Sequence, residues 1–348
     1  MPPPKPLVFL LLLLLVLVVS PASCSEPNPV LALITKDPTT SLYTTSITPG
    51  TNLLVDLAGP LIWSTTCEGG GRSTPLSCQD PACKLAGAYL PPGCRKARHH
   101  QHCHGHYCTA YPYNPFTPRQ CAAGELSRTT FASTTIDATN TLRSVSLTIV
   151  ASCAPRWKKL LPSPAFAAGV AGLSSSGLAL PPQAAAGRNA RDAFFLCLPS
   201  SGRGAALLGA ATVDVLPPEL QALASSMAYA PLVTKRGDDP AYYLPVKGIA
   251  VGDAAVALPS SALAAGVMLS TLAPYTELRS DVYRALVDAF DRAMGRDARV
   301  STPAGAPPFE LCYSSSALLV TKVGYQVPYI DLTLAGGGRN WTMLGSNC

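Results

Sequence analysis

The chain has 348 residues, a length that suits two domains or one large bilobal domain. Hydrophobic residues make up 48% of the chain and charged residues 13%, a composition that excludes an intrinsically disordered protein. The net charge of +6 is mild, and the lysines and arginines do not form the basic stripe with interleaved aromatics that is typical of nucleic-acid-binding proteins. We therefore expect a folded protein with no nucleic-acid partner.

The first 24 residues have the pattern of a secretory signal peptide. Lys5 supplies the positive start, residues 7–19 (LVFLLLLLLVLVV) form a continuous apolar run, and small residues surround Cys24. Because about thirteen apolar residues are too few to cross a bilayer comfortably, this run argues against a membrane anchor. We predict a signal peptide over residues 1–24, a secreted mature protein and no membrane partner.

Short strands separated by turns are predicted through the first half of the chain, because hydrophobic and β-branched residues gather between Pro, Gly, Asp and Thr. The expected strands are residues 30–35, 41–47, 52–57, 128–135, 143–151, 193–198 and 205–210. Residues 64–125 are rich in cysteine, glycine and proline, so we expect an irregular segment there. Pro181 and Pro182 should open a short helix.

The second half begins with a linker over residues 212–230, rich in proline and alanine, after which residues 242–253 have the pattern of strand again. The clearest helix is predicted over residues 280–294 (SDVYRALVDAFDRAM), where apolar residues recur every four positions and Ser280 is the expected cap. Two strand-rich halves of this kind predict an all-β, bilobal protein.

Twelve cysteines predict a disulfide framework, since secreted proteins fold in an oxidising compartment. Cys24 lies at the expected cleavage point, so that removing it from the twelve leaves an odd number. Either cleavage retains Cys24 or one mature cysteine lacks a partner. The candidate disulfide residues are Cys67, Cys78, Cys83, Cys94, Cys103, Cys108, Cys121, Cys153, Cys197, Cys312 and Cys348.

All of the histidines lie close together around Cys103, in the stretch HHQHCHGH. Alternate residues of an extended chain point to the same side, so zinc or copper binding there is chemically feasible. The alternative is a solvated, disulfide-tied loop, which is favoured because no carboxylate lies nearby to support a metal ligand. We expect no metal or other cofactor; the weak candidate ligands are His99, His100, His102, His104 and His106.

Asn340-Trp341-Thr342 is an N-glycosylation acceptor sequence within the stretch GGGRNWT. The glycine-rich setting predicts a turn at the protein surface. In a secreted protein we therefore predict glycosylation at Asn340.

Several segments of the chain are similar to one known family. They are PVLALITKDPTTSLYTTSITPGTNLLVDLAGPLIWSTTC, CTAYPYNP, CAAGELS, GVAGLSSSGLALPPQ, FLCLP, YAPLVTK and VMLSTLAPYTELRSDVYRAL. From about residue 29 to the end they resemble the TAXI-type plant xylanase inhibitors, which belong with basic seed globulins and extracellular dermal glycoproteins in the pepsin-like superfamily. The resemblance implies a pepsin-like fold with an N-terminal lobe over residues 25–211 and a C-terminal lobe over residues 212–348.

The pepsin mechanism needs two aspartates on facing loops that share a proton and hold the attacking water. The family pattern in each loop is Asp-Thr-Gly or similar, and its threonine hydroxyl locks the two loops together. Here Asp56 is present in the first loop, but the following residues are Leu-Ala-Gly instead of Thr-Gly-Ser. In the second loop the resemblance places Leu269 in the aspartate position. It therefore implies a vestigial Asp56 and no catalytic residue.

The resemblance also aligns Tyr113 with the tyrosine of the flap that covers the cleft in active relatives. Asn114, Pro115 and Phe116 replace the flexible turn of that flap, and Pro115 stiffens the chain and removes a hydrogen-bond donor. A stiff, bulky flap suits a closed cleft better than a cleft that admits an extended peptide.

Relatives continue well past the WTM stretch, whereas this sequence stops at Cys348. By the resemblance the C-terminal lobe is truncated, which would expose strand edges and apolar surface. Cys153, Cys197 and Cys312 would then lose partners.

The function that the resemblance implies is inhibition of microbial endo-xylanases in plant defence, by a secreted monomer of the apoplast or cell wall. The partner would be the microbial glycoside hydrolase, whose cleft is blocked without covalent chemistry, and the chain would not be an enzyme. The alternatives are a seed storage or ligand-binding protein like the basic globulins, and a poorly folded truncated product. An active aspartic endopeptidase is a further alternative, against which Leu269 argues.

Overall fold

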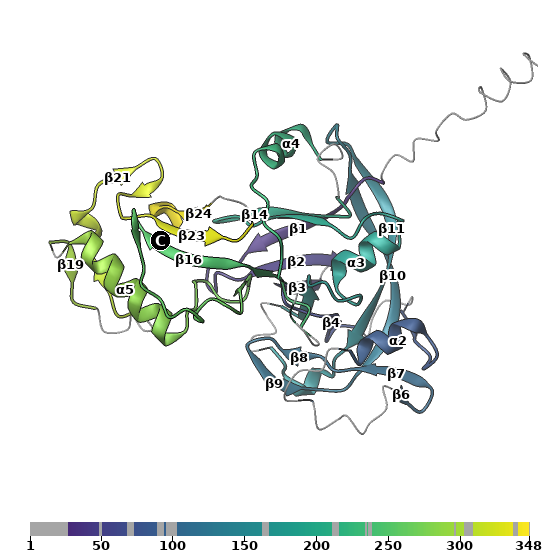
Figure 1. Ribbon diagram of the computed structural model, residues 1–348. Helices are drawn as coiled ribbons and strands as arrows, with labels where there is room; N and C mark the ends of the chain where they lie inside the picture. Colours follow the sequence, from purple (N-terminus) through teal and green to yellow (C-terminus); the bar gives the residue numbers. More distant parts are fainter. Residues whose placement is uncertain are drawn as a thin grey trace, which may run out of the picture.

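The computed structural model describes residues 27–48, 51–67, 73–88, 94, 103–161, 167–210, 216–233, 235, 239–295, 297–302, 309–336 and 340–347. Strands dominate, and they gather in two bodies (Figure 1). We call the described residues from 27 to 210 the N-terminal lobe and those from 239 to 347 the C-terminal lobe. The predicted lobe boundary at residue 211, the predicted signal peptide and Cys348 lie outside the described residues.

A twelve-stranded sheet forms the N-terminal lobe, and all the strands expected in the first half of the sequence are present in it. Its strands are β1 (Val30–Lys36), β2 (Tyr43–Thr48), β3 (Thr51–Asp56), β4 (Ile62–Ser64), β5 (Ser73–Pro75), β6 (Cys103–His104), β7 (Tyr107–Ala110), β10 (Gly124–Ile136), β11 (Leu142–Cys153), β12 (Gly169–Gly172), β13 (Phe194–Cys197) and β14 (Arg203–Leu208). They follow the order β13-β14-β1-β2-β3-β12-β4-β11-β10-β7-β6, with β5 on β10.

The segment 64–125, which we expected to be irregular, contains several strands and a helix. It contains β5, β6 and β7, the short helix α2 (Pro81–Ala86), and a hairpin of β8 (Tyr113–Asn114) and β9 (Thr117–Cys121). Asp80 caps α2 by accepting a hydrogen bond from the Ala82 amide, and a proline opens the helix. Two further short elements of this lobe are the 3-10 turn η2 (Arg156–Lys158) and the predicted helix α3 (Leu180–Ala186).

The C-terminal lobe is built on a smaller, four-stranded sheet with the order β17-β16-β23-β24. Its strands are β16 (Val246–Val251), β17 (Ala254–Ala255), β23 (Ile330–Leu334) and β24 (Asn340–Met343). Short pairs surround it: β15 (Tyr243–Leu244) with β18 (Val267–Met268), β19 (Arg299–Val300) with β20 (Cys312–Tyr313), and β21 (Val320–Thr321) with β22 (Gly324–Tyr325). The turns η4 (Ser315–Ala317) and η5 (Gly345–Asn347) complete the lobe.

Within the described ranges, two helices lie outside the N-terminal lobe, and they can be compared with the elements predicted for the second half of the sequence. The predicted helix is confirmed as α5 (Ser280–Met294), which packs on the four-stranded sheet. Ser280 is its first helical residue, and the cap position is held by Arg279, whose side chain makes no capping hydrogen bond. The expected linker over 212–230 contains a further helix, α4 (Pro218–Ser225), which was not anticipated because alanine and proline were read as linker composition.

The apolar cores of the two lobes differ in how completely their side chains are buried. In the N-terminal lobe, Leu54, Val55, Trp63 and Ile34 are almost fully buried in large clusters. In the C-terminal lobe the cluster between the sheet and α5 has few fully buried members, and Val282 is the one buried residue of α5. Most of the apolar face of α5 is therefore half-exposed.

Four disulfides tie the N-terminal lobe together. They join Cys67 to Cys153, Cys78 to Cys103, Cys83 to Cys108 and Cys94 to Cys121. The expected loss of a partner for Cys153 is therefore wrong, because Cys67 bridges it. Among the described residues Cys197 and Cys312 are unpaired, with Cys197 exposed. No helix in the described part of the chain is long and apolar enough to cross a membrane.

Candidate functional site

Asp56 ends strand β3 at the place where three segments of the N-terminal lobe meet. Strand β12 runs parallel to β3 and places Gly172 beside Asp56, while the turn after Asp56 brings Gly59 back over both. A Cβ on Gly172 would lie 2.3 Å from the carbonyl oxygen of Gly59, and a Cβ on Gly59 would lie 2.8 Å from the Cα of Gly172. Only glycine fits both positions, because the two backbones touch.

The Asp56 side chain is 3% exposed and is held by the backbone of its own turn. Its Oδ1 accepts a hydrogen bond from the amide of Ala58 at 2.9 Å. Burial raises the pKa of Asp56 to about 6, and hydrogen bonds from the amides of Ala58 and Gly59 oppose that rise. At neutral pH Asp56 is therefore a buried carboxylate whose pKa lies close to the solution pH. No cationic side chain is among the causes of its pKa shift.

Thr271 of the C-terminal lobe locks onto the loop that carries Asp56. Its hydroxyl donates to the carbonyl oxygen of Val55 at 2.6 Å and accepts from the amide of Leu57 at 3.2 Å. Thr271 is 3% exposed, so both hydrogen bonds are shielded from water. The lock is one-sided, because Leu57 contributes its backbone where the family pattern has a second threonine.

This contact revises the alignment of the second loop by one residue. In the pattern Asp-Thr-Gly the locking threonine directly follows the aspartate, and the residue directly before Thr271 is Ser270. Ser270 therefore occupies the aspartate position that we assigned to Leu269. The amide of Leu269 instead donates to the carbonyl oxygen of Tyr242, which continues the backbone pairing beside β18. Residues 267–273 (VMLSTLA) contain no carboxylate in either alignment.

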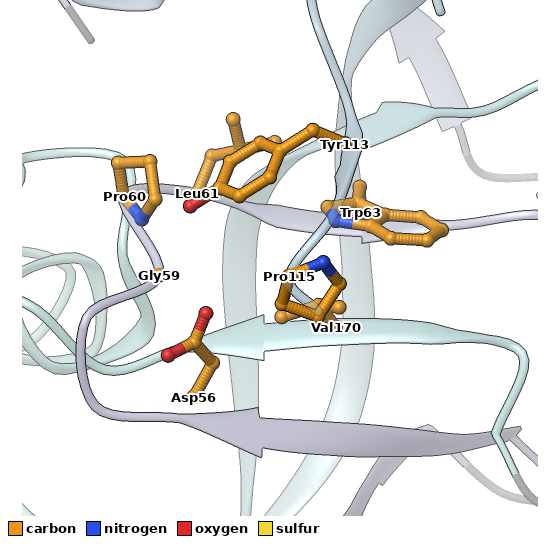
Figure 2. Close-up of a pocket in the computed structure, with 8 residues that line it drawn as sticks. All are labelled: Asp56, Gly59, Pro60, Leu61, Trp63, Tyr113, Pro115 and Val170. Atoms are coloured by element: carbon orange, nitrogen blue, oxygen red, sulfur yellow. The ribbon is translucent and has the colours of Figure 1, made fainter. Parts of the chain in front are cut away.

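A narrow pocket lies above Asp56, under the hairpin of β8 and β9. It is lined by Asp56, Gly59, Pro60, Leu61, Trp63, Tyr113, Pro115 and Val170. Figure 2 shows the carboxylate of Asp56 and the ring of Tyr113 entering it from opposite sides. Burial raises the pKa of Tyr113, and the negative charges of Asp56 and Asp239 raise it further. Asp56 is the single carboxylate among these described lining residues.

The hairpin that bears Tyr113 is braced from within. The Asn114 side chain accepts hydrogen bonds from the amides of Phe116 and Thr117 and donates to Gln120. Asn114 is buried, and Pro115 fixes one dihedral of the turn. These contacts are those of a stiff turn, and they place Pro115 in the pocket wall.

A second carboxylate near this hairpin was not anticipated from sequence. Asp239, at the start of the C-terminal lobe, accepts hydrogen bonds from the Ala241 amide and the Tyr243 hydroxyl. Lys235 lies 3.4 Å above the ring of Tyr243. The only sequence signal was an acidic pair before a proline (DDP), which is ordinary turn composition.

Half of the histidine-rich stretch lies outside the described residues, and that half contains His99, His100 and His102. Within the described part, His104 belongs to β6 and His106 is exposed in the following turn. Cys103, at the centre of the stretch, is bridged to Cys78. No group of three or more His, Cys, Asp or Glu side chains that could hold a metal occurs among the residues that the structure describes.

Two family profiles cover most of the chain: Xylanase inhibitor N-terminal matches residues 43–210, and Xylanase inhibitor C-terminal matches residues 241–348. A rice protein named Chitinase CLP (Oryza sativa subsp. japonica) is 41% identical, over 92% of this chain and 75% of its own. A Nicotiana benthamiana protein named Probable aspartic proteinase GIP2 is 29% identical, over 92% and 78%. The crystal structure of basic 7S globulin from soybean has a TM-score of 0.74 and 25% identity, over 92% and 82%.

Proposed function

The chain belongs to the xylanase-inhibitor family, the TAXI-type group of pepsin-like proteins, and on this premise we propose that it is a secreted, non-proteolytic inhibitor of microbial endo-xylanases. The four disulfides of the N-terminal lobe support a secreted protein, because they persist in oxidising compartments. The net charge of +6 suits a partner with an acidic cleft.

The contact of Thr271 with the loop of Asp56 is the main support for a protein without proteolytic activity. Thr271 brings the second loop onto Val55 and Leu57, directly beside Asp56, and that loop offers Ser270 where a second carboxylate is needed. A serine hydroxyl is too weak an acid to share a proton with Asp56 or to act as the acid partner in amide hydrolysis. The pocket above Asp56 is also narrow and walled by Pro115 of the stiff hairpin.

Inhibition is then occlusion: surface loops of this chain fill the substrate cleft of the xylanase, and no covalent bond forms or breaks. We expect the C-terminal lobe to supply these loops, because large apolar side chains are exposed there, among them Tyr275 and Phe309, whose rings contact each other edge to face. Rigid exposed aromatics are the usual anchors of protein interfaces.

The test is an activity assay of several microbial endo-xylanases with the purified wild-type protein and with Asp56→Asn. Occlusion predicts stoichiometric, reversible inhibition that is equal for the two proteins and leaves the xylanase chain intact on a gel. Loss of xylanase activity through proteolysis would instead disappear in Asp56→Asn. If none of the xylanases is slowed by the wild-type protein, the proposed function is wrong.

Chitin hydrolysis is a second candidate function, favoured by the 41% identity to the rice protein named Chitinase CLP. Glycoside hydrolysis generally uses two carboxylates, one of them with a raised pKa. Asp56 has a raised pKa, and Asp239 is the other carboxylate whose charge acts on Tyr113. Hydrolysis of chitin oligosaccharides by the wild-type protein, lost in both Asp56→Asn and Asp239→Asn, would support this candidate; an inactive wild-type protein would remove it.

A storage or ligand-binding protein is the remaining candidate, because the soybean basic 7S globulin has the same fold. It predicts neither xylanase inhibition nor chitin hydrolysis. The relative named Probable aspartic proteinase GIP2 adds one control, an acid-pH protease assay with and without pepstatin. Pepstatin-sensitive cleavage that is absent in Asp56→Asn would contradict the non-proteolytic assignment.

A further inference from the structure

Strand β24 is the outermost strand of the four-stranded sheet in the C-terminal lobe (Figure 1). It pairs with β23 on one side, and among the described residues no strand pairs with its other side. The sequence of the strand is NWTM. It therefore contains no proline and no charged residue that would block pairing with a strand of another molecule. An unguarded edge of this kind is a site for self-association unless something covers it.

The two faces of β24 differ in chemistry. Trp341 pairs with Leu332 and Met343 pairs with Ile330, so these side chains share the face that packs toward α5. Trp341 is nonetheless 47% exposed, since β24 lies at the margin of that cluster. The margin therefore combines unpaired backbone groups with an exposed indole, a combination that favours strand addition and apolar contact together.

The opposite face of β24 carries the glycosylation acceptor sequence. Asn340 and Thr342 point to this face, where both side chains bond to Asp331 of β23. The Asn340 Nδ2 donates to Asp331 Oδ2 at 2.9 Å, and the Thr342 hydroxyl donates to Oδ1. Asn340 and Thr342 are both exposed. An asparagine amide has two hydrogens, so one can be replaced by a sugar while the other still donates to Asp331.

We propose that Asn340 carries an N-linked glycan and that this glycan keeps the free edge of β24 from pairing with another molecule. In the attachment step Nδ2 forms a bond to C1 of a lipid-linked oligosaccharide. The bond from C1 to the lipid pyrophosphate breaks, the pyrophosphate leaves with the bonding electron pair, and Nδ2 loses one proton. The attached sugars then stand at the edge strand, on the face opposite to Trp341, where they obstruct an approaching strand.

The experiment uses the full chain secreted from a eukaryotic host, as wild type, Asn340→Gln, Thr342→Ala and Thr342→Ser. Thr342→Ser is the matched control, because it keeps both the acceptor sequence and a hydroxyl for Asp331. We expect intact-mass measurement to find a glycan on wild type and Thr342→Ser but not on Asn340→Gln or Thr342→Ala. Peptide N-glycosidase should remove the glycan and convert the asparagine to aspartate in the peptide that contains residue 340.

The second measurement is the oligomeric state, by light scattering after size-exclusion chromatography at increasing protein concentration. We expect the glycosylated proteins to remain monomeric, and the two unglycosylated variants, Asn340→Gln and Thr342→Ala, to self-associate. Adding Trp341→Lys to Asn340→Gln should restore the monomer, because an edge lysine opposes strand pairing. Thr342→Ala destroys the acceptor sequence, leaves Asn340 unchanged and adds no charge, so it keeps the test valid where Asn340→Gln fails to fold. An unmodified Asn340 in the secreted wild type, or unglycosylated variants that fold and stay monomeric, would overturn the proposal.

Discussion

The two lobes bury their apolar side chains to different degrees. The N-terminal lobe closes its sheet around Trp63, which is 1% exposed, and all four disulfides of the described chain lie within it. The C-terminal lobe leaves Trp341 47% exposed on its sheet margin and covers α5 only in part. The core of the first lobe is therefore closed, whereas the second lobe leaves many of its core residues partly exposed.

The lock between the lobes connects these two regions. Thr271 forms hydrogen bonds with the loop of Asp56. In addition, the Ser175 hydroxyl donates to the carbonyl oxygen of Pro240, and the Tyr242 hydroxyl donates to the carbonyl oxygen of Leu173. Because the apolar cluster of the C-terminal lobe has few fully buried residues, we expect these contacts to matter more to its stability than to that of the N-terminal lobe.

The largest expected effect comes from matched tryptophan substitutions in the two lobes. Trp63→Ala should lower the free energy of unfolding by about 3–5 kcal/mol, since it leaves a cavity in a closed core. Trp341→Ala removes a half-exposed side chain and should change it by less than about 1 kcal/mol. Urea denaturation followed by circular dichroism measures both. Equal losses for the two variants would contradict the contrast between a closed and an open core.

Neutralising Asp56 should stabilise the protein at neutral pH. Because burial raises the folded-state pKa to about 6 from 3.8, the folded state binds the proton more tightly, and stability falls as pH rises from about 4 to about 6. Asp56→Asn removes this loss, which amounts to about 3 kcal/mol at pH 7 and vanishes near pH 4.

Thermal melts of wild type and Asp56→Asn between pH 4 and pH 7 test this expectation. The exposed Asp288→Asn is the control and should reproduce the wild-type profile. A wild-type profile that runs parallel to that of Asp56→Asn would show that Asp56 does not titrate in this range.

Removing the lock should lower stability by a smaller amount. Thr271→Val keeps the shape of the side chain but leaves the Leu57 amide and the Val55 carbonyl without this partner, at a cost of about 1–3 kcal/mol. Thr117→Val, at an exposed site of the hairpin, is the control. We expect hydrogen exchange to rise mainly in the C-terminal lobe. A rise confined to the N-terminal lobe would contradict the idea that the second lobe depends on the lock.

The smallest expected effects come from two surface carboxylates, one in each lobe. Asp80 caps α2 and pairs with Arg128, so Asp80→Ala should cost about 1 kcal/mol. Asp291 pairs with Arg299 and accepts from the Tyr313 hydroxyl at the surface, so Asp291→Ala should cost about 0.5 kcal/mol. Chemical denaturation at low and high salt distinguishes them, since salt screens a surface ion pair but leaves the capping hydrogen bond in place. A larger loss for Asp291→Ala would reverse the expected order.

Much of the fold could be predicted from local pattern. Strands β1, β3, β10 and β11 were anticipated because their residues alternate or run apolar between turn residues, and α5 because its apolar residues recur at helical spacing. Helix α4 was missed because alanine and proline describe both a linker and a proline-initiated helix. The strands within 64–125 were missed because their residues are held by disulfides and pairing, more than by their own propensity.

The candidate site was predicted less well, and for a geometric reason. Asp56 and Tyr113 stand out locally, and the pocket brings both together. The alignment of Leu269 was off by one residue, because an apolar run before Ser270 offers no local marker of which residue faces Asp56. Asp239 has only the signal of ordinary turn composition, and its influence on Tyr113 depends on how the start of the C-terminal lobe lies against the first lobe.

The sequence by itself determined a mainly β protein with a cysteine-rich first half, a lone aspartate in an apolar strand and no carboxylate in the second loop. These are statements about local composition and period, which neighbouring residues decide. Only the tertiary structure decided that Thr271 closes onto Val55, that Gly59 and Gly172 touch, and that Trp341 stays half-exposed on an edge strand. Each of these depends on residues far apart in the chain, whose approach is set by sheet register and packing between lobes.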